Sequence, residues 1–149
     1  MRARSILNKL LTMTELGMLL YWVLAVGMAL GLMHVPEDWM YSNHDDPMVV
    51  AWNWSFFPID VLFAGTGLVA RYSRRAPGRL ADVSLTLMFC AGLMALSFWT
   101  LRGELDPFWW GANLWLVGLA SAGFAASSPR FQAQRSERGL ARARADSDE

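Results

Sequence analysis

This sequence has very little cysteine, histidine and charge. Its single cysteine, Cys90, excludes disulfide frameworks, paired-cysteine redox motifs and cysteine-rich metal sites. Two histidines, His34 and His44, leave few ligands for a haem or zinc centre, so we predict no metal and no cofactor. Charged residues make up 17% of the chain, against about 25% in soluble domains. Because 13 basic residues balance 13 acidic ones, net charge indicates no partner, and we predict no nucleic-acid partner.

Apolar residues make up 54% of the 149 positions and gather in four runs. Each run has about the 20 residues that a helix needs to cross a bilayer. Residues 18–33 and 85–101 carry no charge on any face, unlike the helices of a soluble bundle. The first run is too long for a signal peptide and no cleavage site follows it. We therefore predict an all-α, integral membrane four-helix bundle with spans at 10–33, 48–70, 80–101 and 108–126.

Positively charged residues predict the orientation of these spans. Twelve of the 13 basic residues lie in the N-terminal segment, the second connection or the tail, and the other two connections contain only Arg102. Both termini should therefore be cytoplasmic, which makes the chain a multi-pass protein with membrane lipids as neighbours. Residues 1–9 would form a cytoplasmic N-terminus. Residues 127–149 are rich in Arg and then acidic, and we expect them to be disordered or loosely bound to the membrane surface.

Tryptophan is concentrated near the predicted outer surface. An aromatic belt at the headgroup level accounts for most of these side chains. Trp22 and Trp115 differ, because counting residues places them near the middle of the membrane. The six that map to the outer interface are Trp39, Trp52, Trp54, Trp99, Trp109 and Trp110.

The second and fourth spans open alike. Asp46-Pro47 precedes Asn53, and Asp106-Pro107 precedes Asn113 at the same spacing. In each case the Asp can cap a helix whose first turn accommodates Pro. The pattern is compatible with two duplicated helical hairpins related by an axis along the membrane normal, and also with chance similarity between apolar segments. For Asn113 we expect a packing role, through a hydrogen bond to a neighbouring helix.

Asp60 is the most unusual residue of the spans. It lies 11 residues before Arg71, which puts it about 16 Å inside the membrane, near the midplane. An ionised carboxylate there costs at least about 2.5 kcal/mol. No Lys or Arg lies within the predicted spans to pair with it, so we expect Asp60 to be neutral or in contact with water. Pro58 should kink the helix beside it.

Several polar and aromatic residues fall at a similar depth to Asp60. Asn53 lies two turns earlier on nearly the same face. Tyr21 and Trp22 of the first span each carry a donor that a buried carboxyl group could use, and Trp115 comes near this layer. We predict a ligand or proton site formed by these five residues. The alternative is that Asp60 only hydrogen-bonds an aromatic donor and fixes helix packing.

Two other acidic residues are ambiguous. Glu15 is also a candidate for the site, but it lies close enough to the boundary to extend toward Arg4 or Lys9, so structural and functional roles stay equally open. Asp82 begins the third predicted span, where capping is the favoured role. Small residues at 27 and 31, and at 118 and 122, have the spacing of helix-packing motifs.

The chain resembles the YvaD-like family of small, uncharacterised bacterial membrane proteins. The resemblance rests on Thr14-Glu15, Tyr21-Trp22, Ser97-Phe98-Trp99 and the stretches 46–60 and 106–115, of which Ala-Trp-Asn-Trp-Ser-Phe-Phe-Pro at 51–58 is the most distinctive. It implies four membrane helices in a bacterial cytoplasmic membrane, with no assigned activity.

Three functions are compatible with these residues. We favour binding or transport of a small amphipathic molecule or lipid at a mid-membrane polar site centred on Asp60. A membrane enzyme could instead use Asp60 as general acid on a lipid or isoprenoid, with aromatic faces stabilising a developing cation. A single well-placed acid without a nucleophile and base disfavours that interpretation. The third possibility is an accessory membrane subunit, and the sequence allows a homo-oligomer or a partner subunit.

Overall fold

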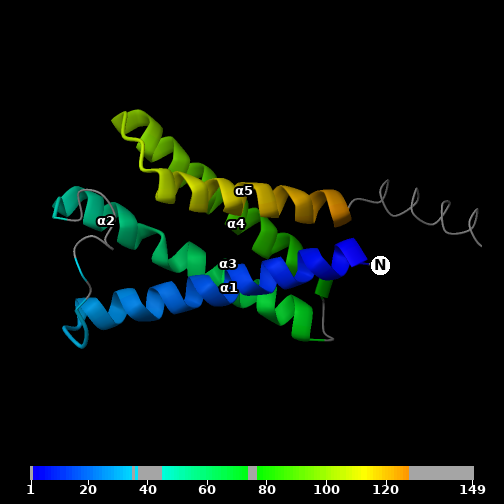
Figure 1. Cartoon of the computed structure of the whole chain (residues 1–149). Coiled ribbons are helices and arrows are strands. Elements are labelled where there is room, and N and C mark those ends of the chain that lie inside the picture. The colour runs from blue at the N-terminus through cyan, green and yellow to red at the C-terminus, as the bar shows by residue number, and fades with distance from the viewer. Residues whose placement is uncertain (1, 35, 37–44, 74–76, 128–149) are drawn as a thin grey trace, which may run out of the picture.

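A computed structural model describes residues 2–34, 36, 45–73 and 77–127 of the chain (Figure 1). In this part every regular element is an α-helix, so the predicted all-α class is confirmed. His44, Trp39 and the predicted tail from residue 128 onward lie outside the described residues. The five helices are α1 (Arg2–Ala29), α2 (Pro47–Ser55), α3 (Phe57–Tyr72), α4 (Pro77–Arg102) and α5 (Pro107–Ser127).

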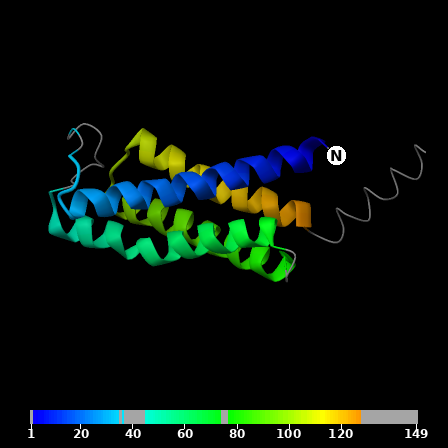
Figure 2. The same cartoon turned by 90° about the horizontal axis from the view of Figure 1, so that it is seen from below.

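The helices form an up-and-down bundle of four rods, because α2 and α3 follow each other along a single broken rod (Figures 1 and 2). Helix α3 packs against α1 and α4, α4 packs against α5, and α5 meets α1 along a smaller contact. The start of α1, the end of α3, the start of α4 and the end of α5 lie at one end of the bundle (Figure 1). We call this the basic end, since Arg4, Lys9, Arg71 and Arg79 lie there.

The first helix is longer at its start than the apolar pattern predicts. It begins at Arg2 rather than at residue 10, because polar residues continue a helix beyond the hydrophobic length. It ends at Ala29, four residues short of the predicted span. Gly31 takes a φ of 68°, and Leu32 N–H donates to the Gly27 carbonyl at 2.9 Å. This is the Schellman arrangement, which a glycine past the helix end permits.

The predicted kink at Pro58 is confirmed. Pro58 cannot donate to the carbonyl of Trp54, and the helix breaks at Phe56, between α2 and α3. Phe56 N–H donates to the Asn53 carbonyl at 3.1 Å, and the regular pattern resumes when Asp60 N–H donates to the Phe56 carbonyl at 2.9 Å. By contrast, α5 runs without a break, so the two proposed hairpins differ at this point.

Both predicted aspartate caps are present. An oxygen of Asp46 accepts from Met48 N–H at 2.8 Å, and one of Asp106 accepts from Phe108 N–H at 3.0 Å. The prediction for Asp82 is wrong, because α4 begins at Pro77 and places this exposed carboxylate beyond its first turn. Two rods of the bundle therefore begin with the same kind of aspartate cap.

The small residues at which two helices come close together are not the ones that have the predicted motif spacing. A Cβ atom added to Gly92 would lie 2.9 Å from the Asn113 carbonyl oxygen, and one on Gly123 would lie 2.6 Å from a Leu85 methyl group. Gly118, from one predicted motif, has nothing within 4 Å of such an atom. Gly27 approaches Met33, which lies beyond its own helix, rather than another rod.

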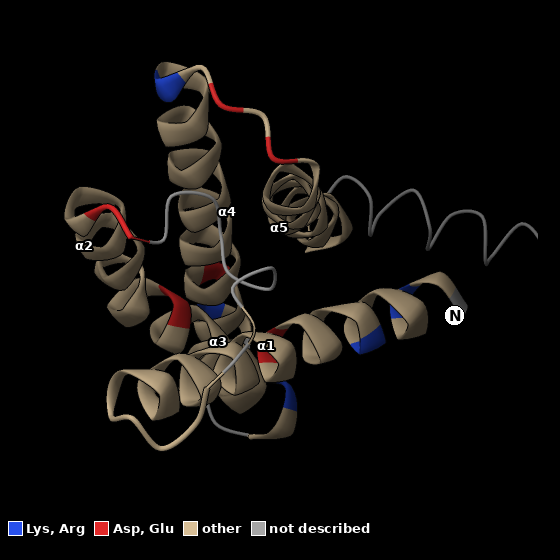
Figure 3. Ribbon diagram, turned by 60° about the vertical axis from the view of Figure 1, so that its left-hand side comes forward, with Lys and Arg blue, Asp and Glu red and all other residues tan. Residues whose placement is uncertain are grey.

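Large apolar side chains point outward from the middle of the helices. Val23 is 65% exposed, Leu62 55% and Met94 57%. Figure 3 shows long uncharged stretches in every helix. Among the described residues, three helical segments are long and apolar enough to cross a membrane: Ala3–Ala29, Pro47–Tyr72 and Gly78–Arg102. Helix α5 is not among these three segments, although it carries no charge.

Candidate functional site

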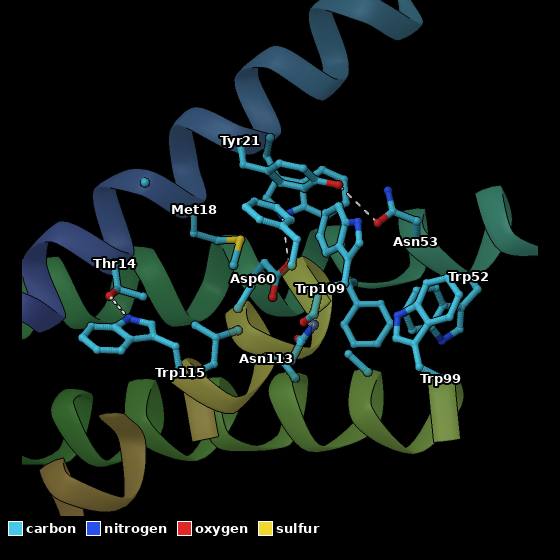
Figure 4. Close-up of a pocket in the computed structure, with 18 residues that line it drawn as sticks. Thr14, Met18, Tyr21, Trp52, Asn53, Asp60, Trp99, Trp109, Asn113 and Trp115 are labelled. Atoms are coloured by element: carbon cyan, nitrogen blue, oxygen red, sulfur yellow. Dashed lines mark hydrogen bonds between the residues drawn. The ribbon is translucent and has the colours of Figure 1, made fainter. Parts of the chain in front are cut away.

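A cavity of about 320 Å³ lies between the four rods, toward the end of the bundle opposite the basic end. Figure 4 shows that side chains from every rod surround it. Most of its wall is aromatic or aliphatic. The residues that line it are Thr14, Gly17, Met18, Tyr21, Trp22, Trp52, Asn53, Phe56, Asp60, Ala91, Ala95, Trp99, Phe108, Trp109, Ala112, Asn113, Trp115 and Leu116.

Asp60 is the acidic residue of this cavity. Its side chain is nearly buried, with 6% of the residue exposed, and Oδ2 accepts a hydrogen bond from Trp22 Nε1 at 3.0 Å. Within the described part of the chain, Asp60 forms no ion pair. Its other oxygen, Oδ1, has no protein hydrogen-bond partner among the same residues. One carboxyl oxygen is thus bound by the protein and the other is available to a ligand or to water.

The helix break explains how a carboxyl group can be placed at this depth. Because α3 starts at Phe57, Asp60 falls in the first turn of a helix instead of the middle of one. Pro58 therefore does more than bend the rod, since the break beside it places Asp60 at the beginning of a helix.

A second polar contact crosses the cavity above Asp60. Tyr21 Oη donates to Asn53 Oδ1 at 3.2 Å and joins α1 to α2. The Tyr21 ring also packs edge-on against Trp22, with centroids 5.1 Å apart. Asn113 behaves differently from our prediction, since its Nδ2 donates to the Trp109 carbonyl of its own helix at 2.8 Å.

The aromatic wall includes residues that the belt interpretation placed at the membrane surface. Trp99 is 1% exposed, so for this residue the belt prediction is wrong. Trp52 stacks on Phe98 at 3.9 Å and packs edge-on against Trp99 at 5.5 Å. Trp99 Nε1 is buried and has no hydrogen-bond partner among the described residues. A buried donor without an acceptor is costly, and a ligand oxygen could satisfy it.

Trp115 forms the edge of the cavity. It is 47% exposed, and its Nε1 donates to Thr14 Oγ1 at 2.9 Å, which bridges α5 and α1. Phe108 lies two turns earlier on α5 and is 74% exposed. The exposed lining residues thus lie along α1 and α5, and the cavity opens sideways between these two helices.

Glu15 does not join the other five predicted site residues. It is fully buried nearer the basic end and forms an ion pair with Arg71 of α3, not with Arg4 or Lys9 as the sequence suggested. Ser84 and Gly67 lie close beside it. The ion pair joins two helices because α1 and α3 run antiparallel, which brings their basic ends together. Asp60, Asn53, Tyr21, Trp22 and Trp115 do share the one cavity.

Sequence reasoning missed several lining residues, notably Thr14, Trp52, Trp99 and Trp109. A signal for Trp99 existed, because Ala91, Ala95 and Trp99 follow one another at helical spacing and define one face of α4. For metals, the described residues contain no grouping of three His, Cys, Asp or Glu side chains. Carboxylate, amide and indole groups in an apolar wall suit recognition of a small molecule.

The fold and cavity define an all-helical bundle with helical segments of membrane-spanning length around an aromatic-lined pocket that contains a carboxyl group. Residues 7–124 match the sequence model of DUF5360, a family of unknown function, and the chain belongs to this family. It is 43% identical over 108 residues to the uncharacterized protein YvaD of Bacillus subtilis (strain 168), which covers 70% of this chain and 77% of that protein. The predicted resemblance to a YvaD-like family is thus confirmed. No solved structure matches the chain.

Proposed function

We propose that this chain is a multi-pass protein of the bacterial cytoplasmic membrane, with four spans and both termini in the cytoplasm. Three membrane-length apolar helices and the exposed apolar side chains around the bundle support this placement. A fourth rod, α5, has 21 residues and no charge, so it is long enough to cross with the others. The basic end would face the cytoplasm, in accord with the positive-inside rule.

Reporter fusions test this topology. A fusion at Asp45 should report the outer compartment and a fusion at Pro77 the cytoplasm, because one span lies between them. The same compartment at both positions would contradict the four-span arrangement.

Within this frame, the protein binds a small amphipathic molecule in the cavity centred on Asp60. The observation that carries this function is a buried carboxyl group with one oxygen directed to no protein donor, inside an aromatic-lined cavity. A ligand with an amine or hydroxyl group could donate to Oδ1 of Asp60. Its apolar part would lie against the rings of Trp22, Trp52 and Trp109.

The position of the opening indicates how such a molecule would enter. The exposed lining residues of α1 and α5 would face acyl chains in the membrane, so the cavity opens toward lipid. A molecule dissolved in the bilayer could therefore reach Asp60 without crossing the polar ends of the bundle. This route favours a lipid-soluble ligand over a fully hydrated one.

The test compares the small molecules and lipids that co-purify with three forms of the full-length protein. Asp60→Asn keeps an acceptor for Trp22, so the variant should fold, yet it changes the group that faces the cavity. Mass spectrometry should detect a small molecule with the wild type that is lost from Asp60→Asn. The matched control is Asp82→Asn, an identical change at an exposed residue of α4, which should retain it.

An unchanged set of co-purified molecules in Asp60→Asn would contradict the binding function. Asp60 would then act in helix packing, as expected for an accessory subunit. A protein partner that co-purifies in mild detergent and is lost with substitutions on the exposed helix faces would support that role instead.

A further inference from the structure

A second cavity lies at the basic end of the bundle, where α1 begins and α3 ends. Its volume is about 950 Å³, and it shares no lining residue with the cavity around Asp60. Three of its residues are basic and none is acidic. The lining consists of Arg4, Ser5, Asn8, Lys9, Thr12 and Met13 from α1, with Arg71 and Tyr72 from α3.

The polar groups of this cavity come mostly from one face of α1. Positions 4, 5, 8, 9 and 12 recur at the spacing of successive helical turns, so their side chains lie side by side. Arg4 and Lys9 supply two positive charges on exposed, flexible side chains. Between them, Asn8 and the hydroxyl groups supply neutral hydrogen-bond donors.

Arg71 approaches from the opposite wall and is more rigidly held. Its side chain is 17% exposed, and its ion pair with the fully buried Glu15 fixes the guanidinium group from behind. The Nε and Nη2 atoms of Arg71 are buried on the side of Glu15, so they do not face the cavity. The N–H groups of Nη1 remain as the donors that Arg71 can offer to a phosphate oxygen.

We propose that this cavity binds the phosphate group of an anionic phospholipid headgroup. Two mobile cations, one fixed guanidinium group and neutral donors form the set that recognises a phosphate anion. A free phosphate would satisfy the same groups, but the rim favours a lipid. Met13 is 69% exposed and Tyr72 75% exposed beside the cavity.

Apolar surface continues from this rim along the bundle. Leu16 and Leu20 follow Met13 on α1 and are 54% and 58% exposed, and Val69 precedes Tyr72 on α3. Acyl chains could lie on this surface while the headgroup occupies the basic cavity. The proposed membrane placement puts the cavity at the headgroup level of the cytoplasmic leaflet, where basic pockets between helices bind lipid headgroups.

The experiment measures lipid retention by the full-length protein with native mass spectrometry. Phosphatidylglycerol and phosphatidylcholine with identical acyl chains are added to the purified protein. The wild type should retain phosphatidylglycerol preferentially. Arg4→Gln and Lys9→Gln should each weaken this retention about fivefold, since each removes one charge near the surface. Both side chains are exposed, so the variants should keep the helical circular dichroism of the wild type.

Arg79→Gln is the matched control, because it removes an exposed positive charge at the same end of the bundle but outside the cavity. It should leave retention unchanged. An equal loss of lipid retention in all three variants would overturn the proposal. Retention would then depend only on the total positive charge at the basic end of the bundle. Displacement of the lipid by inorganic phosphate alone at millimolar concentration would overturn the lipid assignment. The Asp60 substitutions do not touch this cavity, so the two binding proposals can be contradicted separately.

Discussion

Trp22 Nε1 donates a hydrogen bond of 3.0 Å to Oδ2 of Asp60, which joins α1 to the first turn of α3. The indole ring is itself packed edge-on by Phe57 at 5.1 Å and tilted against Trp54 at 5.5 Å. These two aromatic rings therefore fix the donor, and the donor fixes the carboxyl group. The protein itself, rather than a ligand, therefore sets the orientation of Oδ1 toward the cavity.

Trp22→Phe should destabilise the protein by at least about 0.6 kcal/mol, the average measured for hydrogen bonds between membrane helices. Phenylalanine is smaller than the buried indole, so lost packing adds to the loss of the donor. Unfolding in detergent followed by circular dichroism measures the effect. Trp115→Phe removes an exposed indole hydrogen bond to Thr14 and should have a smaller effect. Equal destabilisation by the two substitutions would mean that burial adds nothing to the bond with Asp60.

Gly92→Ala should destabilise the bundle by about 1 to 3 kcal/mol, because the new Cβ atom would lie 2.9 Å from the backbone oxygen of Asn113. A backbone atom cannot rotate away, so α4 and α5 must separate. Gly118→Ala makes the same chemical change where nothing lies within 4 Å, and should be neutral or stabilising by up to about 1 kcal/mol. Thermal midpoints of the two variants give the comparison. A stabilised Gly92→Ala protein would contradict the close approach of these helices.

Glu15→Leu should destabilise the protein by about 3 kcal/mol, since it leaves the charge of Arg71 without its buried partner. Arg71→Leu should do the same to the carboxylate. The double variant removes both charges and should be more stable than either single one. Unfolding free energies of the four proteins form a double-mutant cycle. Strictly additive losses would show that the two side chains do not interact.

Local patterns predicted the parts of the fold that depend on nearby residues. The helical segments, the caps at Asp46 and Asp106, and the break at Pro58 all follow from interactions within one or two helical turns. The match in depth between Trp22 and Asp60 also followed from the sequence. Antiparallel neighbouring rods and a fixed rise per residue are enough to align the two levels.

The tertiary structure alone decided which faces of the helices meet. A helix that is apolar on every side gives no sequence signal for the face it buries, because its surface has no polar side to orient it. This is why the ion pair of Glu15 with Arg71 was not predicted. The sequence thus determined where polar groups lie along each rod. The packing of all four rods determined which of these polar groups face one another, and it thereby formed the two cavities.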